Sequence, residues 1–464
     1  MSTSNDTFTT PFDFTFEKVI ITADRFDFQV DLTYMISEIN MFEHVDKPYL
    51  TGTILFNDNA NLYNEINWLG TEKVEISIKT DDKLADHQIT KKFRVVRIAQ
   101  AVKANDQNEM FLLDLVEDHA YESRLKNVQQ SYQGYHHEII EKILKDHLNR
   151  ELMHVPKTGF KKIRAIVPNM TPLDAANWIK DGTPDAFGSP YFLYSTIADD
   201  KIRFIDLETI LNLPPINKKT PYIFNQAFGP KTDATEPSGG TLDDSYIIQA
   251  YKTSNTEDVL KLVRNGYVGS KWNFFDLYKG DQYEVKHDIT KVYESMIARN
   301  VFREPQVDPV FDEDANIHQQ SSREINQIAT SRVYSDWENF KSYHEDEEAA
   351  LHEQKVKQKA LRHFLLKAPI DINVPGKNFL LKDKNLTIGN IIDVEFHIND
   401  DMFLDIERDN KRSGQYFVYA ARHVFTVNRY TVNLMCAKMA QSRGVEKTWR
   451  HLVENITEKN STGS

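Results

Sequence analysis

The stretch MFEHVDKPYLTGTILFNDNANLYNEINWLGTEKVEISI, residues 41–78, predicts two β-strands joined by a structured loop. Pro48 cannot donate to a sheet ladder, so a turn or a strand edge is expected there. Residues 49–56 are rich in β-branched and aromatic side chains, which favours a strand. The Asn and Asp side chains of residues 57–61 end that strand because they bond their own backbone. After Gly70, apolar and polar residues alternate as in a half-buried strand.

The composition of the whole chain indicates a folded protein of several domains. Its 464 residues correspond to about three or four units of the usual domain size. Hydrophobic residues make up 40% and aromatic residues 11%, which excludes wholesale disorder. The 56 Lys and Arg residues are outnumbered by 69 Asp and Glu residues, so the net charge is −13. This balance argues against binding nucleic acid by neutralising phosphates, and it is compatible with a surface past which DNA slides.

Cysteine content and hydropathy point to a protein made in a reducing cytoplasm. Cys436 is the only cysteine of the sequence, so no disulfide is expected within the chain and zinc sites built on cysteine are excluded. The first residues, MSTSNDTFTTPF, lack the basic region and the apolar core of a signal peptide. No apolar run approaches the roughly 20 residues that a membrane-spanning helix needs.

The residue pattern divides the chain into six regions. They are a flexible arm at residues 1–14, a strand-rich domain at 15–120, an α+β module at 121–215, an insert with loops and a long helix at its end at 216–360, a second strand-rich domain at 361–440 and a polar tail at 441–464. Many short strands separated by turn residues favour a barrel or a sandwich for the strand-rich domains. In residues 345–364 acids come first and bases last, as the dipole of a helix favours.

Two helices and a hairpin are predicted in the α+β module. Apolar residues at helical spacing predict a helix over residues 136–150. Thr171 as the N-cap and Pro172 as the first helical residue predict where a second helix begins. Strands are expected over residues 191–197 and 201–207, on either side of a turn.

Three parts of the sequence resemble the hub proteins of contractile-tail baseplates. This family includes bacteriophage hubs and the hub part of type VI secretion spikes. The first part, similar to the family's first tube-like domain, contains Glu43, Pro48, Gly52, Asp58, Gly70 and Glu72. The second, similar to its middle domain, begins at Thr171 and Pro172. The third, similar to its second tube-like domain, contains Pro375, Gly376, Gly389, Ser413, Gly414 and Tyr416. These residues are called the signature positions below.

The resemblance implies an α+β multidomain fold, with two tube-like antiparallel β-barrel domains, an inserted α/β module and a long helix. It implies a structural virion protein, a trimeric baseplate hub that adapts the threefold tail spike to the sixfold tail tube and leaves a channel for DNA. The expected partners are further copies of this chain, the tail spike protein, the tail tube protein and other baseplate proteins. DNA is expected to pass without sequence-specific binding. The protein is expected in the tail baseplate of the virion, assembled in the host cytoplasm, with no cofactor and no membrane.

Short motifs that are typical of catalysis are incomplete in this sequence. The segment from His137 begins like the zinc-protease motif His-Glu-x-x-His, but Glu141 stands where the second imidazole is needed. The segment from His344 fails in the same way and opens a helix, where acidic residues are favoured. We interpret both segments as solvated helix faces. Cys436 lies in an alternating strand and is expected to be a small buried residue rather than a nucleophile. The sequence therefore predicts no catalytic or metal-binding residue.

Two other classes of function remain as alternatives, a tail-associated hydrolase of cell-wall glycan and a host-surface carbohydrate-binding protein. The hydrolase would use one of the acidic runs Asp199-Asp200, Asp312-Glu313-Asp314 or Asp400-Asp401. A catalytic acid needs burial to raise its pKa, whereas these runs stand in polar, turn-like contexts. The sequence shows no repeat of aromatic binding sites that would support a carbohydrate-binding protein. We interpret the aromatic clusters at residues 191–194 and 272–278 as core. If the second cluster were exposed, it would be a candidate contact for a neighbouring tail protein.

Overall fold

The computed structural model describes most of the chain between residues 10 and 438. The described ranges are 10–25, 28–66, 68–80, 88–103, 109–155, 162–183, 188–224, 244–253, 259–276, 281–298, 324–329, 345–364, 368–381, 387–399, 406–409 and 412–438. The expected tail at residues 441–464 lies outside them. So do the acidic runs at 312–314 and 400–401, and His344.

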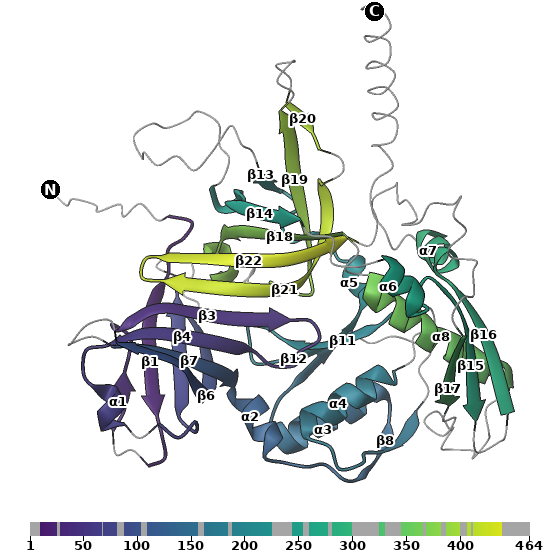
Figure 1. The fold of residues 1–464 in the computed structure, drawn as a ribbon, viewed down its shortest axis with the longest axis horizontal. Helices are drawn as coiled ribbons and strands as arrows, with labels where there is room; N and C mark the ends of the chain where they lie inside the picture. The colour runs from purple at the N-terminus through teal and green to yellow at the C-terminus, as the bar shows by residue number, and fades with distance from the viewer. Residues whose placement is uncertain are drawn as a thin grey trace, which may run out of the picture.

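One large sheet connects fourteen strands of the described residues (Figure 1). Its N-terminal strands are β1 (Thr15–Thr22), β2 (Val30–Asp31), β3 (Ile36–His44), β4 (Thr51–Asp58), β5 (Lys73–Lys79), β6 (Gln88–Lys103) and β7 (Glu109–Glu117). Its later strands are β13 (Tyr222–Phe224), β14 (Ala250–Thr253), β18 (Ala368–Pro375), β19 (Ile391–Asn399), β20 (Ile406–Arg408), β21 (Gly414–Thr426) and β22 (Arg429–Lys438). The strands predicted over residues 49–56 and after Gly70 are β4 and β5, with a short helix, α1 (Leu62–Glu65), between them.

The two strand-rich regions share one strand order. In the first, β3 pairs with β4, β4 with β7, β7 with β6 and β6 with β5. In the second, β14 pairs with β18, β18 with β22, β22 with β21 and β21 with β19. All eight pairs are antiparallel, and both series occur in the same order along the chain. We call them the first and the second β unit.

The second β unit begins earlier in the chain than expected. Its strands β13 and β14 come from residues 222–224 and 250–253, which the sequence assigned to the insert at 216–360. The predicted boundary at residue 361 is therefore wrong for these strands. The reason is that strands of three and four residues are too short to show a period of two, so only their long-range pairing marks them as part of the sheet.

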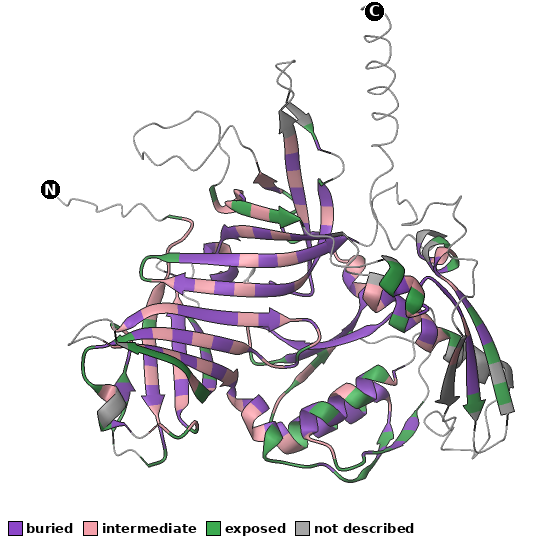
Figure 2. Cartoon of the chain, in the orientation of Figure 1, coloured by how far each residue is buried: buried purple, intermediate pink, exposed green. Residues whose placement is uncertain are grey.

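The two β units are joined edge to edge inside the chain. Strand β21 pairs with β3 in antiparallel register, from Ala420 opposite His44 to Thr426 opposite Glu38. The two strands lie side by side in Figure 1, and Figure 2 shows buried residues along both of them. We call this pairing the β3–β21 seam. A single hydrophobic core continues across it, from Ile39 and Met41 to Phe425 and Val432.

The α+β module follows the first β unit and is built largely as predicted. Its helices are α2 (Asp118–Arg124), α3 (His136–Leu148), α4 (Pro172–Asp181) and α5 (Leu207–Leu211). Its strands are β8 (Ser131–Gly134), β9 (Leu152–His154), β10 (Ile163–Ile166), β11 (Tyr191–Ser195) and β12 (Ile202–Asp206). The helical period at 136–150 is confirmed by α3, which buries its apolar face. The hydroxyl of Thr171 accepts a hydrogen bond from the amide of Asp174, which confirms the predicted N-cap.

The insert contains more regular structure than the predicted loops. It holds α6 (Val259–Arg264), β15 (Gly269–Asp276), β16 (Asp281–Asp288), α7 (Ile289–Ala298), β17 (Glu324–Ala329) and the predicted long helix α8 (Glu345–Phe364). Strand β15 lies between β16 and β17 in a separate sheet. Trp272 and Phe274 of β15 are buried with Val356 of α8, so these two rings are core, as interpreted. Phe275 is 36% exposed, and Tyr278 lies outside the described residues.

The N-terminal arm is shorter than the predicted span of residues 1–14. The carbonyl of Pro11 accepts a hydrogen bond from the amide of Lys377, and the carbonyl of Phe12 accepts one from Tyr430. The ring of Phe14 lies 5.2 Å from that of Phe425, centroid to centroid. Residues 11–14 are therefore packed against the second β unit, because their aromatic rings cover its apolar surface. Among the described residues, no helix is long and apolar enough to cross a membrane.

Candidate functional site

The candidate site is a buried polar junction where the two β units and the α+β module meet. At its centre is Glu43 of β3, whose carboxylate accepts hydrogen bonds from the amide of Ile197 and the hydroxyl of Thr387. Nε2 of His423, from β21, lies 3.5 Å from the same carboxylate. Ile197 follows β11 of the α+β module, whereas Thr387 and His423 belong to the second β unit. One carboxylate therefore connects all three parts of the chain.

Glu43 is held in its charged form. Burial by itself raises the pKa of a carboxyl group, because it penalises the charge. The charge of His423 and the hydrogen bonds from His423, Thr387 and Ile197 act in the opposite direction, and the pKa of Glu43 lies below its ordinary value. The other ring nitrogen of His423 is 2.8 Å from the hydroxyl of Tyr430, so the imidazole is oriented from both sides. This arrangement orders a junction and offers no proton for acid catalysis.

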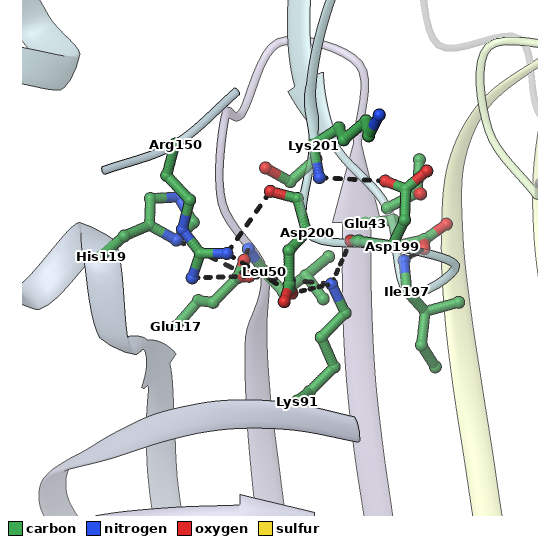
Figure 3. A network of polar contacts seen from close by, with 12 residues as sticks. Glu43, Leu50, Lys91, Glu117, His119, Arg150, Ile197, Asp199, Asp200 and Lys201 are labelled. Atoms are coloured by element: carbon green, nitrogen blue, oxygen red, sulfur yellow. Dashed lines mark hydrogen bonds and ion pairs between the residues drawn. The ribbon is translucent and has the colours of Figure 1, made fainter. Parts of the chain in front are cut away.

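A second group of charges holds the turn between β11 and β12 against the first β unit (Figure 3). The side chain of Lys91, on β6, is 2% exposed. Its ammonium group donates to the carbonyl of Asp199 and lies 3.2 Å from a carboxylate oxygen of Asp200. It also lies 3.8 Å from the carboxylate of Glu117, on β7. Lys91 is therefore the cation shared between the first β unit and the α+β module.

Glu117, the last residue of β7, and Pro48, just before β4, join the same junction. The carboxylate of Glu117 accepts a hydrogen bond of 2.8 Å from the amide of Leu50. The carbonyl of Pro48 lies 2.8 Å from Nε2 of His119 and accepts a hydrogen bond of 3.0 Å from the hydroxyl of Ser195. Because proline interrupts the ladder before β4, its carbonyl is available to bind α2 and β11. Pro48 thus marks a turn, as expected, and the structure shows what that turn contacts.

The carboxylates of Asp199 and Asp200 are ion-paired rather than arranged for acid catalysis. Arg203 binds Asp199 with an N–O distance of 2.6 Å, and Arg150 lies 3.4 Å from Asp200. Burial raises the pKa of each carboxyl, but these arginines and Lys91 outweigh it, so both pKa values lie below the ordinary value. The two residues do lie in the turn between β11 and β12, as predicted. The prediction that Asp199 is solvated is wrong in part, because its carboxylate pairs with the buried Arg203. A glycosidase acid needs a raised pKa, so this pair does not favour hydrolysis.

Three glycines of the signature positions, Gly52, Gly376 and Gly389, sit where a side chain would collide with a neighbouring strand or ring. A Cβ at Gly52 would lie 2.7 Å from the carbonyl oxygen of Asn40 on β3. Gly389 has a φ of 71°, and a Cβ there would lie 2.6 Å from Cζ of the buried Tyr194. Gly389 therefore allows the second β unit to approach β11 closely, at the same junction as Glu43.

Glu72 and Gly70 organise the loop that leads into β5. The buried carboxylate of Glu72 accepts hydrogen bonds from the amides of Leu69, Gly70 and Thr71, and it pairs with Arg25. Burial raises its pKa, whereas these partners lower it by a larger amount, so it lies below the ordinary value. The φ of Gly70 is 74°, which favours glycine. These two positions shape a loop within the first β unit, away from the junction.

The remaining signature positions shape turns. Asp58 accepts from the amide of Ala60, and Ser413 exchanges two hydrogen bonds with the backbone of Phe396. A further set comprises Pro375 at the end of β18, Gly376 against the ring of Tyr430, Gly414 at a φ of 123°, and Tyr416, whose hydroxyl donates to the carbonyl of Arg412. The structure thus brings Glu43, Pro48 and Gly389 together and leaves the others distributed over the fold.

Sequence reasoning missed Lys91, Glu117 and His423. A signal for them existed in the alternation of their strands. In β7, Phe111, Leu113 and Leu115 point into the core, and Glu117 continues the same phase. Lys91 likewise stands at the inward phase of β6, between Ile89 and Phe93. A charged residue in the apolar phase of a strand predicts a buried ion pair, because an unpaired buried charge is too costly.

Of the motifs that resembled catalytic sites, the structure describes the one at His137 and the residue Cys436. Among the described residues, no group of three or more His, Cys, Asp or Glu side chains could hold a metal ion. The ring of His137 stacks on His154 at a centroid distance of 4.4 Å. Cys436 is fully buried, which raises the pKa of its thiol, as a structural cysteine requires. Residues 191–194 are buried, in agreement with their interpretation as core.

Comparison with solved structures places the fold. A tail protein from Neisseria meningitidis is 12% identical and has a TM-score of 0.50, covering 92% of this chain and 97% of that one. The chain has a tail-protein fold. The 43 kDa tail protein of prophage MuSo2 from Shewanella oneidensis is 9% identical, with a TM-score of 0.48 and coverage of 92% and 98%. A component of the Escherichia coli type VI secretion system is 10% identical, with a TM-score of 0.39 and coverage of 92% and 79%.

The likeness to tail proteins is found by comparing structures and not by comparing sequences. No protein-family model matches the chain, and no curated protein matches it in sequence. At 12% identity, the likeness to the Neisseria meningitidis protein is one of fold alone. The antiparallel β-rich architecture with few helices agrees with the predicted fold class, whose two tube-like barrels remain a prediction.

Proposed function

We propose that this chain is a structural virion protein, the trimeric hub of a contractile-tail baseplate. The observation that carries the proposal is the pair of β units with one strand order, joined edge to edge through the β3–β21 seam. Three chains with two such units each supply six similar units. A ring of this kind offers sixfold symmetry to the tail tube and threefold symmetry to the tail spike, which are its proposed partners in the virion baseplate.

Strand pairing supports the proposal that each β unit is a tube-like barrel. In the first unit, β5 pairs with β1 and β1 with β2, which leads directly into β3. In the second, β19 pairs with β13, and Ile223 of β13 bridges to Ile247, just before β14. In both units the last strand of the series is therefore linked, through a further strand, to the segment just before the first strand, β3 or β14. A barrel that closes on itself requires such a link.

The signature positions and the buried junction then have a mechanical role. Glu43, Lys91 and Gly389 hold the two β units and the α+β module in one relative orientation. Because ring closure depends on the angle between successive units, a rigid junction is what a symmetry adaptor needs. The signature positions accordingly have structural roles, and no cofactor is required.

The assembly is expected to have the mass of three chains. Three chains of 53.9 kDa sum to about 162 kDa, which light scattering distinguishes from a monomer or a dimer. Electron microscopy of the tail particle is expected to show a channel wide enough for a DNA duplex and lined by acidic or neutral side chains, because basic residues would retain phosphate. A dimer or tetramer in the particle, or a strongly basic channel, contradicts the proposal.

Catalysis is expected to be absent. Purified protein is expected to leave bacterial cell wall intact in a clearing assay, because Asp199 and Asp200 have lowered pKa values. It is expected to contain no stoichiometric zinc, because the described residues hold no cluster of three metal-binding side chains. Measurable clearing would favour the alternative of a tail-associated glycan hydrolase. Retention on host-surface glycan, without clearing, would favour the carbohydrate-binding alternative. A lysozyme used as a positive control establishes the sensitivity of the clearing assay.

A further inference from the structure

The outer half of β6 has an open strand edge. From Phe93 to Lys103, β6 pairs with β7 on one side. On the other side β5 covers only Gln88 to Arg94. Among the described residues, no strand pairs with the second edge of residues 96–103. Val96 is 51% exposed and Val102 43%, so this edge also presents apolar side chains. An uncovered apolar edge of this kind is a template for another strand.

The second β unit shows what covers the equivalent edge. Strand β21, the counterpart of β6, pairs with β19 through Gly414 to Phe417 and with β3 through Ala420 to Thr426. The change of partner occurs at a bulge next to Val418. Strand β6 has a bulge at the same place, next to Val95, and a second one between Ile98 and Gln100 that β21 lacks.

Backbone hydrogen bonds align the two bulges. The amide of Val95 donates to the carbonyl of Glu72 at 2.9 Å, and the amide of Val418 donates to the carbonyl of Asn390 at 2.9 Å. Residues 97–103 of β6 are therefore the counterpart of the part of β21 that forms the β3–β21 seam. In the second unit that part is covered by β3, and in the first it is open.

Strand β14 is the counterpart of β3, and no strand of the described ranges pairs with its outer side. It pairs with β18 in the way that β3 pairs with β4. It is the first strand in the order of the large sheet. Three of its four residues are exposed, and Figure 2 shows β14 largely in the colour of exposed residues. The chain therefore carries both halves of a second seam, at two places that do not meet within it.

We infer that the outer half of β6 pairs with β14 of a neighbouring copy of this chain. This inference rests on the proposed trimeric hub and names its contact between chains. A second copy is the occupant because both open edges belong to this chain and are counterparts of the two edges that already pair in the β3–β21 seam. Repeating one kind of seam within and between chains is what a ring of six similar units requires.

The β3–β21 seam also sets the register of the second seam. In the first unit, Met41 pairs with Gly52, which pairs with Leu115 on its other side. In the second unit, Thr253 pairs with Ile370, which pairs with Cys436. Leu115 and Cys436 are the partners of the two bulge residues Val95 and Val418, so Thr253 is the counterpart of Met41. Met41 lies opposite His423. His423 pairs with Val432, four residues before Cys436. Ala101 pairs with Phe111, four residues before Leu115. Ala101 is therefore the counterpart of His423. Thr253 is therefore expected opposite Ala101, and Lys252 opposite Val102.

Cysteine cross-linking tests this register. The double variant Ala101→Cys and Thr253→Cys, in the full-length chain, is expected to form disulfides between chains under mild oxidation, because directly opposed residues have the Cα separation that a disulfide needs. Covalent dimers and trimers are then expected on a non-reducing gel. Cys436 does not compete, because it is fully buried.

Two matched variants serve as controls. Lys103→Cys with Thr253→Cys places the thiols two residues out of register, along a part of β6 without a bulge. It is expected to cross-link at least about tenfold less, since neighbouring register positions exceed disulfide reach. Glu38→Cys with Thr426→Cys lies across the β3–β21 seam and is expected to form a disulfide within one chain, without a covalent dimer. The single variant Ala101→Cys measures how often chains cross-link through chance encounters of this thiol.

The outcomes separate this inference from the proposed hub. Cross-linking of the matched pair, and not of the shifted pair, in an assembly with the mass of three chains supports both. A trimer in which the matched pair stays reduced, or links no better than the shifted pair, overturns the β6–β14 seam and leaves the hub standing. If the purified chain is a monomer, the same oxidation is applied to tail particles that carry the variants. Particles with two or four copies overturn both.

Discussion

Replacing Glu43 with alanine is expected to lower the free energy of unfolding by about 3–5 kcal/mol, the usual loss when one partner of a buried charge pair is removed. The substitution leaves the amide of Ile197, the hydroxyl of Thr387 and the imidazole of His423 without their shared acceptor. It also loosens the junction between all three parts of the chain. Urea denaturation at pH 7, followed by intrinsic fluorescence and circular dichroism, measures the loss.

Glu38→Ala is the matched control on the same strand. Glu38 is partly exposed and lies 3.6 Å from Arg422, so its removal is expected to cost about 0–1 kcal/mol. Equal losses for the two variants would show that Glu43 has no special role at the junction. Glu43→Gln keeps the shape without the charge, and we expect a loss between those of the two alanine variants.

Acidification is expected to remove the contribution of Glu43. Its folded-state pKa lies below the ordinary value of 4.5, so the unfolded chain takes up the proton first as the pH falls. The stabilisation is therefore complete above pH 4.5 and is lost as the pH falls through the folded-state pKa. The difference in stability between the native protein and Glu43→Gln is expected to be constant from neutral pH down to about pH 4.5 and to shrink between there and the folded-state pKa. A difference that grows on acidification contradicts this assignment.

Gly389→Ala is expected to destabilise the protein by about 2–5 kcal/mol. The left-handed backbone costs roughly 1–2 kcal/mol for a residue with a Cβ. Overpacking a filled site adds about 1–3 kcal/mol, because the new methyl group collides with the ring of Tyr194. Tyr194 is buried and cannot move aside without disturbing β11. Thermal and urea denaturation are expected to show the loss.

Gly182→Ala is the control for this substitution. Gly182 ends helix α4 at a φ of −88°, and a Cβ there would lie at an ordinary 3.6 Å from the carbonyl oxygen of Ile179. The change is expected to be neutral or stabilising by up to about 1 kcal/mol, because alanine restricts the unfolded chain. If Gly389→Ala is equally well tolerated, the close approach of the second β unit to β11 does not constrain the fold.

The amino-acid sequence by itself determined the local elements and their order. The N-cap at Thr171, the helical period of α3 and the alternation of β22 act within a few residues, so they can be predicted without a structure. The resemblance to hub proteins also depended on such local patterns. Of the junction, Glu43, Pro48 and Gly389 were found in this way, although nothing in the sequence indicated that they meet.

Only the tertiary structure decided which strands pair and which charges share a site. Glu43 lies 344 positions from its partner Thr387, and Lys91 lies 109 positions from Asp200. The short strand β14 shows no periodicity and is recognised by its ladder with β18 alone. The physical reason is that alternation sets which face of a strand is buried, whereas its partner is set by long-range register and by the shape of the shared core. The β3–β21 seam, and the open edges that repeat it, belong to that second level.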